Sequence, residues 1–365
     1  MKEEIEMKRK KKKFIPGVPT HIYQKGYDGR TLFYCARDRL LYLSIFFAEA
    51  RARGVKVYSI VLMYNHIHAT ILCRSQTGMI RFNQAVERRY ASAFNRVSGR
   101  LGPVFMHSFG WAQKRSDADV RSNLCYLANN PVKKKLCKKG IENQWTLLAY
   151  GKTPYPFSEP LSLRKASRRM RRAVALAKGV LARGQVLNDK LLDRVFASLD
   201  QKESRQMVDY LIHTLSTVDY EAAARYFGGF EKMIMAFDVT TGAEYDISEE
   251  FVPVPDRAYT EMIKLVEEEG YDPVRKAFLS AEADEKMRLI QLFRSETSAS
   301  ERQIRRFLYL SSASPVFQKT GSADYSGIHH PVFWDQDPLV HDYAMFPGPV
   351  LDEYDYSFFP GPEIE

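Results

Sequence analysis

The alternation of hydrophobic and polar positions divides the first 150 residues into short strands and amphipathic helices. Residues 55–63 (VKVYSIVLM) are rich in β-branched residues and hydrophobic on both faces, which predicts a strand in the centre of a sheet. Residues 66–73 (HIHATILC) follow a short Tyr-Asn turn and predict the neighbouring strand. Upstream, HIYQ and TLFY flank a glycine-containing turn between residues 20 and 34, and they predict two further strands.

Helical spacing of hydrophobic residues alternates with these strands. It predicts helices over residues 37–53, 77–98 and 116–131, with an extended segment over residues 102–114. Ser116 and Asp119 form a capping-box pattern at the start of the third helix. Strands separated by single helices predict an α+β fold of about 150 residues, in which an antiparallel sheet carries packed helices.

Beyond residue 155 the pattern becomes mainly helical. Ser298-x-x-Glu301 predicts the start of a short helix that exposes Arg302, Gln303, Arg305 and Arg306. Together with a preceding helix, residues 284–310 form either a helix-turn-helix that enters a major groove or a solvated basic face of a helical bundle. Residues 327–365 contain eight acidic residues and no Lys or Arg, which predicts a disordered acidic tail.

Positive charge is concentrated in the first part of the chain. Residues 1–154 contain 29 Lys and Arg against 10 Asp and Glu, whereas the remaining residues contain 25 against 34. A basic domain favours a polyanionic partner, because neutralised phosphates release condensed counterions. No run of 18 hydrophobic residues and no secretory signal is found, and the four cysteines lack metal-site spacing. These features predict a cytoplasmic protein without a membrane partner.

The most distinctive local motif is His66-Ile67-His68. Residues i and i+2 of a strand share a face, so both imidazoles project together while Ile67, Ala69 and Ile71 point into the core. Two imidazoles on one face form half of a metal site. The alternative is that such a pair is merely part of a half-exposed surface.

A second candidate is Tyr126, which lies on the helix that ends in Asn129-Asn130-Pro131. Tyr126 and Asn130 are i, i+4 neighbours on the helix, so their side chains can reach the same place. A phenol can attack a phosphodiester when a metal polarises the phosphate. Because the chain contains 21 tyrosines, the alternative is that Tyr126 is a packing residue.

Three motifs in this order, YNHIH, GPVFMHSF and YLANNPVKKKL, resemble those of the HUH single-tyrosine transposases, and in particular the REP-associated tyrosine transposase branch. The resemblance covers roughly residues 19–150. It implies an HUH nuclease-type domain with a ferredoxin-like core at residues 19–154. A basic arm (residues 1–18) would precede this domain, and a mainly α-helical extension (155–326) and the acidic tail (327–365) would follow it.

The resemblance also implies the chemistry. His66, His68 and Asn130 would hold Mg²⁺ or Mn²⁺, and Tyr126 would be the nucleophile that forms a 5′-phosphotyrosine link. The partner would be single-stranded or hairpin DNA in a bacterial cell, bound by the protein as a homodimer or as a monomer. Candidate DNA contacts are Arg81, Arg88, Arg89, Lys114, Arg115, Lys133 and Lys134.

Two other functions remain open at this point. A DNA-binding regulator could keep the same fold without cutting, although His66, His68 and Tyr126 are all present. Replication initiators and relaxases share the HUH chemistry, but the Tyr-x-x-x-Asn-Pro-Val pattern fits them poorly.

The basic arm generates the first prediction. Lys8 to Lys13 are all cationic, so deletion of residues 1–13 should weaken DNA binding for every sequence and reduce its salt dependence. The measurement is the slope of log Kd against log salt concentration. An unchanged slope would show that the arm serves solubility only.

Overall fold

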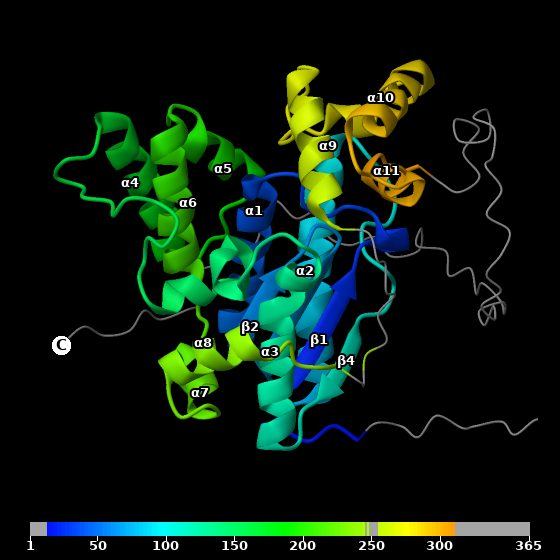
Figure 1. Cartoon of the computed structure of the whole chain (residues 1–365). Coiled ribbons are helices and arrows are strands. Elements are labelled where there is room, and N and C mark those ends of the chain that lie inside the picture. Colours follow the sequence, from blue (N-terminus) through cyan, green and yellow to red (C-terminus); the bar gives the residue numbers. More distant parts are fainter. Residues whose placement is uncertain (1–12, 245–246, 248–254, 311–365) are drawn as a thin grey trace, which may run out of the picture. The chain divides into compact units, whose positions relative to one another are not determined.

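One antiparallel sheet organises the N-terminal part of the chain. The computed structural model describes residues 13–244, 247 and 255–310, and among them four strands pair in the order β2-β3-β1-β4 (Figure 1). The strands are β1 (Thr20–Lys25), β2 (Lys56–Leu62), β3 (His66–Leu72) and β4 (Gly110–Gln113). The predicted α+β class with an antiparallel sheet is therefore confirmed. The prediction of a second strand at TLFY is wrong. That segment is an irregular connection whose Leu32 and Phe33 amides both donate to the Tyr64 carbonyl.

The register between β1 and β3 decides which side chains share a face. Tyr23 lies opposite His68, and His21 lies opposite Thr70. Since strand side chains alternate, these residues share one face, and Ile22, Ile67, Ala69 and Ile71 point to the other, as predicted. On that second face they join the main hydrophobic core.

Two long helices supply the rest of this core. They are α1 (Ala36–Arg53) and α2 (Gln76–Ser98), which contact each other through Phe46 and Phe82. Gly54 and Gly99 end these helices in the left-handed conformation that glycine adopts without strain.

Helix α3 (Asp117–Lys133) covers the opposite face of the sheet. It begins with the predicted capping box, in which Ser116 accepts from the Asp119 amide and Asp119 accepts from the Ser116 amide. Tyr126 and Leu127 pack with Val61 and Met63 in a small hydrophobic cluster. The helix predicted over residues 116–131 continues to Lys133 with Pro131 inside it, and the proline, which has no amide proton, removes only one helical hydrogen bond.

The prediction that residues 55–63 form a central strand is wrong, since β2 is an edge of the sheet. The chain after α6 covers this edge: Val218 forms a parallel bridge with Val57, and the Asp219 amide donates to the Val57 carbonyl at 2.8 Å. A covered edge strand buries both faces and reads in sequence like a central one.

The remaining helices follow in sequence and pack partly into the same core as α1 and α2. They are α4 (Arg168–Ala182), α5 (Asp189–Phe196), α6 (Gln201–Leu215), α7 (Tyr220–Arg225), α8 (Phe230–Val239), α9 (Arg257–Glu268), α10 (Ala283–Glu296) and α11 (Glu301–Phe307). Short 3-10 turns occur at Tyr27–Gly29, Gly140–Glu142, Gln144–Thr146, Leu148–Gly151 and Ala277–Leu279.

Helix α11 presents only part of the basic face that its sequence predicted, because Arg302 is exposed but the other predicted residues are half-buried or buried. Gln303 and Arg306 are buried, and Arg305 pairs with Asp28 at 2.5 Å. Arg306 also donates to the Asp28 carbonyl at 3.1 Å. Arg305 and Arg306 therefore attach α11 to the segment that follows β1, whereas Gln303 donates to the Pro255 carbonyl at 3.1 Å.

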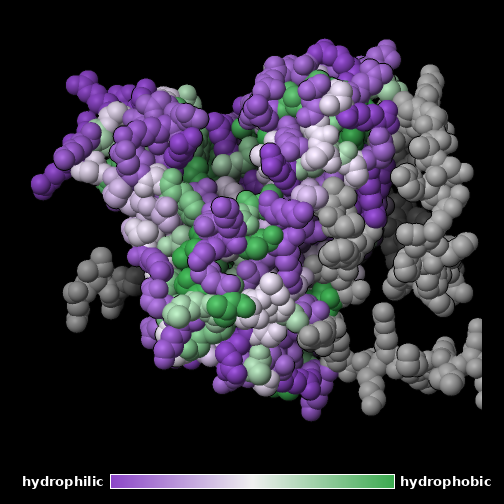
Figure 2. All heavy atoms as spheres, viewed as in Figure 1, coloured by the Kyte–Doolittle hydropathy of each residue, from purple (hydrophilic) through white to green (hydrophobic). Residues whose placement is uncertain are grey.

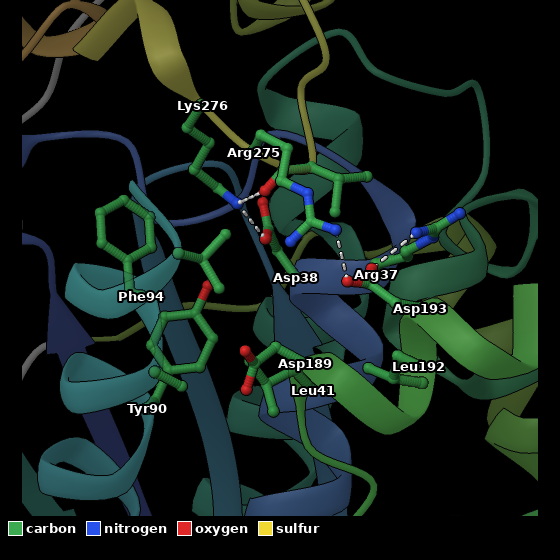
Figure 3. A pocket seen from close by; sticks show the side chains of 13 residues that line it. Arg37, Asp38, Leu41, Tyr90, Phe94, Asp189, Leu192, Asp193, Arg275 and Lys276 are labelled. Atoms are coloured by element: carbon green, nitrogen blue, oxygen red, sulfur yellow. Dashed lines mark hydrogen bonds and ion pairs between the residues drawn. The ribbon is translucent and has the colours of Figure 1, made fainter. Parts of the chain in front are cut away.

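A buried ion pair connects the segment after α9 to the start of α1. Lys276 Nζ lies 2.6 Å from Asp38 Oδ1, and both side chains are less than a tenth exposed (Figure 3). Nearby, Asp193 of α5 binds both Arg37 and Arg275. The small hollow between these groups is crossed by ion pairs, which favours a structural role.

The surface of the helical part is mainly hydrophilic, but hydrophobic side chains gather near α8 (Figure 2). Met235 and Val239 of this helix are strongly exposed. Among the described residues, no helix combines the length and hydrophobicity required to cross a membrane. The acidic tail and residues 1–12 of the basic arm lie outside the described residues.

The Lys276–Asp38 pair generates a stability prediction. Replacement of Lys276 by Met leaves the Asp38 carboxylate buried without its cation, and should lower the free energy of unfolding by about 3 kcal/mol. Lys202→Met is the matched control, because Lys202 pairs with Glu159 on the surface and its replacement should leave the free energy of unfolding almost unchanged. Equal urea midpoints for the two variants would contradict this account.

Candidate functional site

The His-x-His motif lies inside the protein, between β3 and α3. His66 is 7% exposed and His68 is fully buried. Both imidazoles share one face of β3 as predicted, but α3 covers that face. The sequence reasoning, which placed them away from any core, did not predict this enclosure.

Asn130 contacts both histidines of the motif. Its Nδ2 lies 3.1 Å from His68 Nε2, and its Oδ1 lies 3.4 Å from His66 Nε2. Asn130 lies inside α3, so Pro131 does not displace its backbone from the helical conformation. The three predicted ligand residues are therefore adjacent.

The hydrogen bonds of Asn65 fix the orientation of His66. Asn65 Nδ2 donates to the Gly29 carbonyl at 3.1 Å, which leaves its Oδ1 to accept from His66 Nδ1 at 2.7 Å. With the proton on Nδ1, Nε2 carries a lone pair. This lone pair faces the Asn130 oxygen, which is also an acceptor, and a cation between them would remove the repulsion.

His68 is connected to two residues that the sequence reasoning did not identify. His68 Nδ1 and His21 Nε2 are 2.9 Å apart, and His21 Nδ1 donates to Glu244 Oε2 in a short contact. The register of β1 against β3 would have identified His21, because this residue lies diagonally across from His68. Nothing in the local sequence indicates Glu244, which is 223 positions from His21.

Glu244 is buried at the side of this cluster, with its side chain 2% exposed. Besides His21, its carboxylate binds Lys114 Nζ at 2.8 Å and accepts from Asn123 Nδ2 at 3.1 Å. Asn123 in turn accepts from Thr70 of β3 at 2.8 Å. Glu244 therefore links β1, β3, α3 and the end of β4.

Tyr126 is next to the histidines on α3, one turn before Asn130. Its ring centroid lies 5.8 Å from that of His68, and the two rings are perpendicular. Lys133 Nζ lies 4.4 Å from the Tyr126 ring centroid. Tyr126 is 9% exposed, so the phenol is at the edge of an enclosed site.

The predicted DNA-contacting residues fall into separate places. Lys133, Lys134 and Arg115 are at least partly exposed around α3, whereas Lys114 is buried against Glu244. Arg81, Arg88 and Arg89 lie on α2, on the side of the sheet away from the histidines, and Arg89 pairs with Glu49 at 2.5 Å. The structure therefore does not bring the α2 arginines to the site.

Comparisons with known proteins add little to this geometry. No protein-family model and no curated protein matches the chain. A solved structure described as a REP-associated tyrosine transposase bound to a REP hairpin is similar, with 16% sequence identity and a TM-score of 0.34. The match covers 44% of this chain and 98% of that one.

The donor set consists of two imidazoles and one amide oxygen. Among the described residues there is no group of three or more His, Cys, Asp or Glu arranged to hold a metal. Glu244 does not supply the third group, because its carboxylate is bound to His21, Lys114 and Asn123. A metal at this place would therefore depend on Asn130.

Burial keeps His68 neutral. Loss of hydration lowers the pKa of His68 well below its ordinary value, and the nearby His21 lowers it further. Glu244 opposes this shift, and Lys133 adds to it. A neutral imidazole is the form that binds a metal ion.

The lowered pKa of His68 predicts how stability depends on pH. The unfolded chain takes up a proton at this residue below about pH 6.5, whereas the folded protein resists protonation. Folding stability should therefore be complete above this pH and fall as the pH decreases, by at most about 1.4 kcal/mol per pH unit from this residue. Urea unfolding at pH 7.5 and 5.5 measures the difference in folding stability. The His68→Gln protein should show a smaller pH dependence than the wild type. Equal dependences in the two proteins would contradict the assignment.

Proposed function

We propose that this protein cleaves and rejoins single-stranded DNA through a 5′-phosphotyrosine intermediate, with a divalent cation as cofactor. The observation that carries the proposal is the position of Asn130. Its amide group reaches the Nε2 atoms of both histidines, and it lies one helical turn from Tyr126. A candidate nucleophile therefore lies next to three candidate ligand groups.

Tyr126 performs the covalent step. Its phenol loses its proton to solvent and its oxygen attacks the scissile phosphorus, forming a tyrosyl ester with the 5′ side of the break. The bond from phosphorus to the 3′ oxygen breaks, and that oxygen takes up a proton from solvent. The phosphodiester energy is retained in the new ester, so the reverse attack by a 3′-hydroxyl rejoins DNA without ATP. The ammonium of Lys133, near the Tyr126 ring, stabilises negative charge on the phenol.

His66, His68 and Asn130 would hold Mg²⁺ or Mn²⁺. Such an ion, when bound, polarises the phosphate and stabilises the leaving oxygen. Mg²⁺ prefers oxygen ligands, so two nitrogen donors favour Mn²⁺ at this site. Asn65 and His21 hold the two imidazoles with Nε2 towards Asn130, which prepares the site before an ion arrives.

The DNA strand would approach along α3. Lys133 and Lys134 follow Asn130 at the end of this helix, and Arg115 precedes its start. Lys and Arg side chains that contact phosphates fix the position of a strand without reading its sequence. The arginines of α2 lie on the other side of the sheet and would contact only DNA that extends around the protein.

Replacement of Tyr126 by Phe tests this proposal. The change removes one oxygen and keeps the ring, so DNA affinity should remain within about two-fold while cleavage and the covalent adduct disappear together. Labelled single-stranded oligonucleotides from the flanks of the gene, with Mn²⁺, are followed on denaturing gels. Mass spectrometry of the trapped wild-type protein should place the nucleotide on the Tyr126 peptide.

Tyr58→Phe is the control variant. Tyr58 is half-buried and packs against the cluster that contains Val120 and Leu124 of α3, so Tyr58→Phe removes a phenol oxygen beside the same helix. This variant should cleave like the wild type. An adduct on another tyrosine would show that this residue, and not Tyr126, is the nucleophile. Tight DNA binding without any adduct would favour a non-catalytic DNA-binding regulator.

A further inference from the structure

Glu244 reaches the site from the chain that follows α8, outside the sheet and its first three helices. Gly242 fixes this approach. A Cβ atom at position 242 would lie 2.2 Å from the Ser122 carbonyl oxygen and 2.4 Å from the Tyr126 amide nitrogen, and the residue has a φ of +64°. Only glycine permits this contact with α3, which places Glu244 within reach of His21.

The hydrogen bonds from Glu244 to His68 have one consistent direction. The Glu244 carboxylate only accepts, so the proton between it and His21 belongs to His21 Nδ1. In a neutral His21 ring, Nε2 is then an acceptor, and His68 Nδ1–H donates a hydrogen bond to it. His68 Nε2 is left with a lone pair, which accepts from Asn130 Nδ2.

We infer that Glu244 and His21 form a positioning relay that holds His68 in the tautomer whose Nε2 can bind the divalent cation. This inference rests on the metal site of the proposed function. Carboxylate–histidine pairs behind a metal-binding histidine fix its ring and raise its basicity. Here the carboxylate acts through an intervening second histidine, and it comes from the helical extension.

The competing explanation is that Glu244 only neutralises Lys114. Lys114 is 6% exposed and would be costly to bury without its carboxylate partner. The two roles use different oxygens, since Oε2 faces His21 and Oε1 faces Lys114. Substitutions can therefore separate them.

The test uses the full chain without metal, labelled with ¹⁵N-histidine, at pH 7.5. Ring nitrogen shifts report which nitrogen of His68 carries the proton. The relay predicts Nδ1–H in the wild type and a mixture of both tautomers in Glu244→Ala, where His21 loses its acceptor. Glu244→Gln retains an acceptor oxygen and should restore the wild-type tautomer. A wild-type His68 that carries its proton on Nε2 would overturn the relay.

Mn²⁺ affinity, measured by titration calorimetry with the same proteins, provides the second measurement. Glu244→Ala should weaken binding about 10-fold or more, and Glu244→Gln should weaken it less. Lys114→Met keeps the relay and should remain within about two-fold of the wild type. A loss in Lys114→Met equal to that in Glu244→Ala, with an unchanged tautomer, would overturn the relay and leave Glu244 as the partner of Lys114.

A His66→Ala protein separates failure of the relay from failure of the proposed function. The wild type should bind Mn²⁺ and His66→Ala should not. If neither binds, the metal site itself is wrong and the relay fails with it. If the wild type binds and both Glu244 variants match it, only the relay is overturned.

Discussion

The pairing of β1 with β3 is the constraint on which the site depends. With Tyr23 opposite His68, the two-residue period of the strands places His21, His66, His68 and Thr70 on one face. The ring of Tyr23 stacks on that of His68 at a centroid distance of 4.7 Å, which fills the space beside the histidine. A slip of one residue would turn His21 into the hydrophobic core and remove the partner of His68 Nδ1.

The helical extension contributes to this part of the molecule at several points. Val218 and Asp219 cover the edge of β2, α11 packs beside the turn after β1, and Lys276 neutralises Asp38 at the start of α1. Glu244 enters the site itself. The extension and the sheet thus share both a core and a polar network, although the composition of the chain changes sharply between them.

The sequence predicted the parts of the site that depend on local periodicity. The shared face of His66 and His68 follows from strand alternation, and the proximity of Tyr126 and Asn130 follows from one helical turn. The sequence did not predict the enclosure of the histidines, the edge position of β2 or the role of Glu244. Each of these depends on contacts between residues far apart in the chain, which local pattern does not report. For the same reason the sequence did not predict that Arg305 of α11 pairs with Asp28, which precedes it by 277 positions.

The approach of Gly242 to α3 has a consequence for the order in which the protein matures. During synthesis the sheet, the histidines and Tyr126 leave the ribosome more than a hundred residues before Glu244 does. Contacts of such long range form late, since closing a long loop costs entropy before any contact compensates for it. A nascent chain therefore holds Tyr126 next to an incomplete polar cluster, and the last side chain of that cluster arrives only when the extension folds against α3. The polar cluster is therefore completed only after the extension has folded, well after its histidines and Tyr126 have been synthesised.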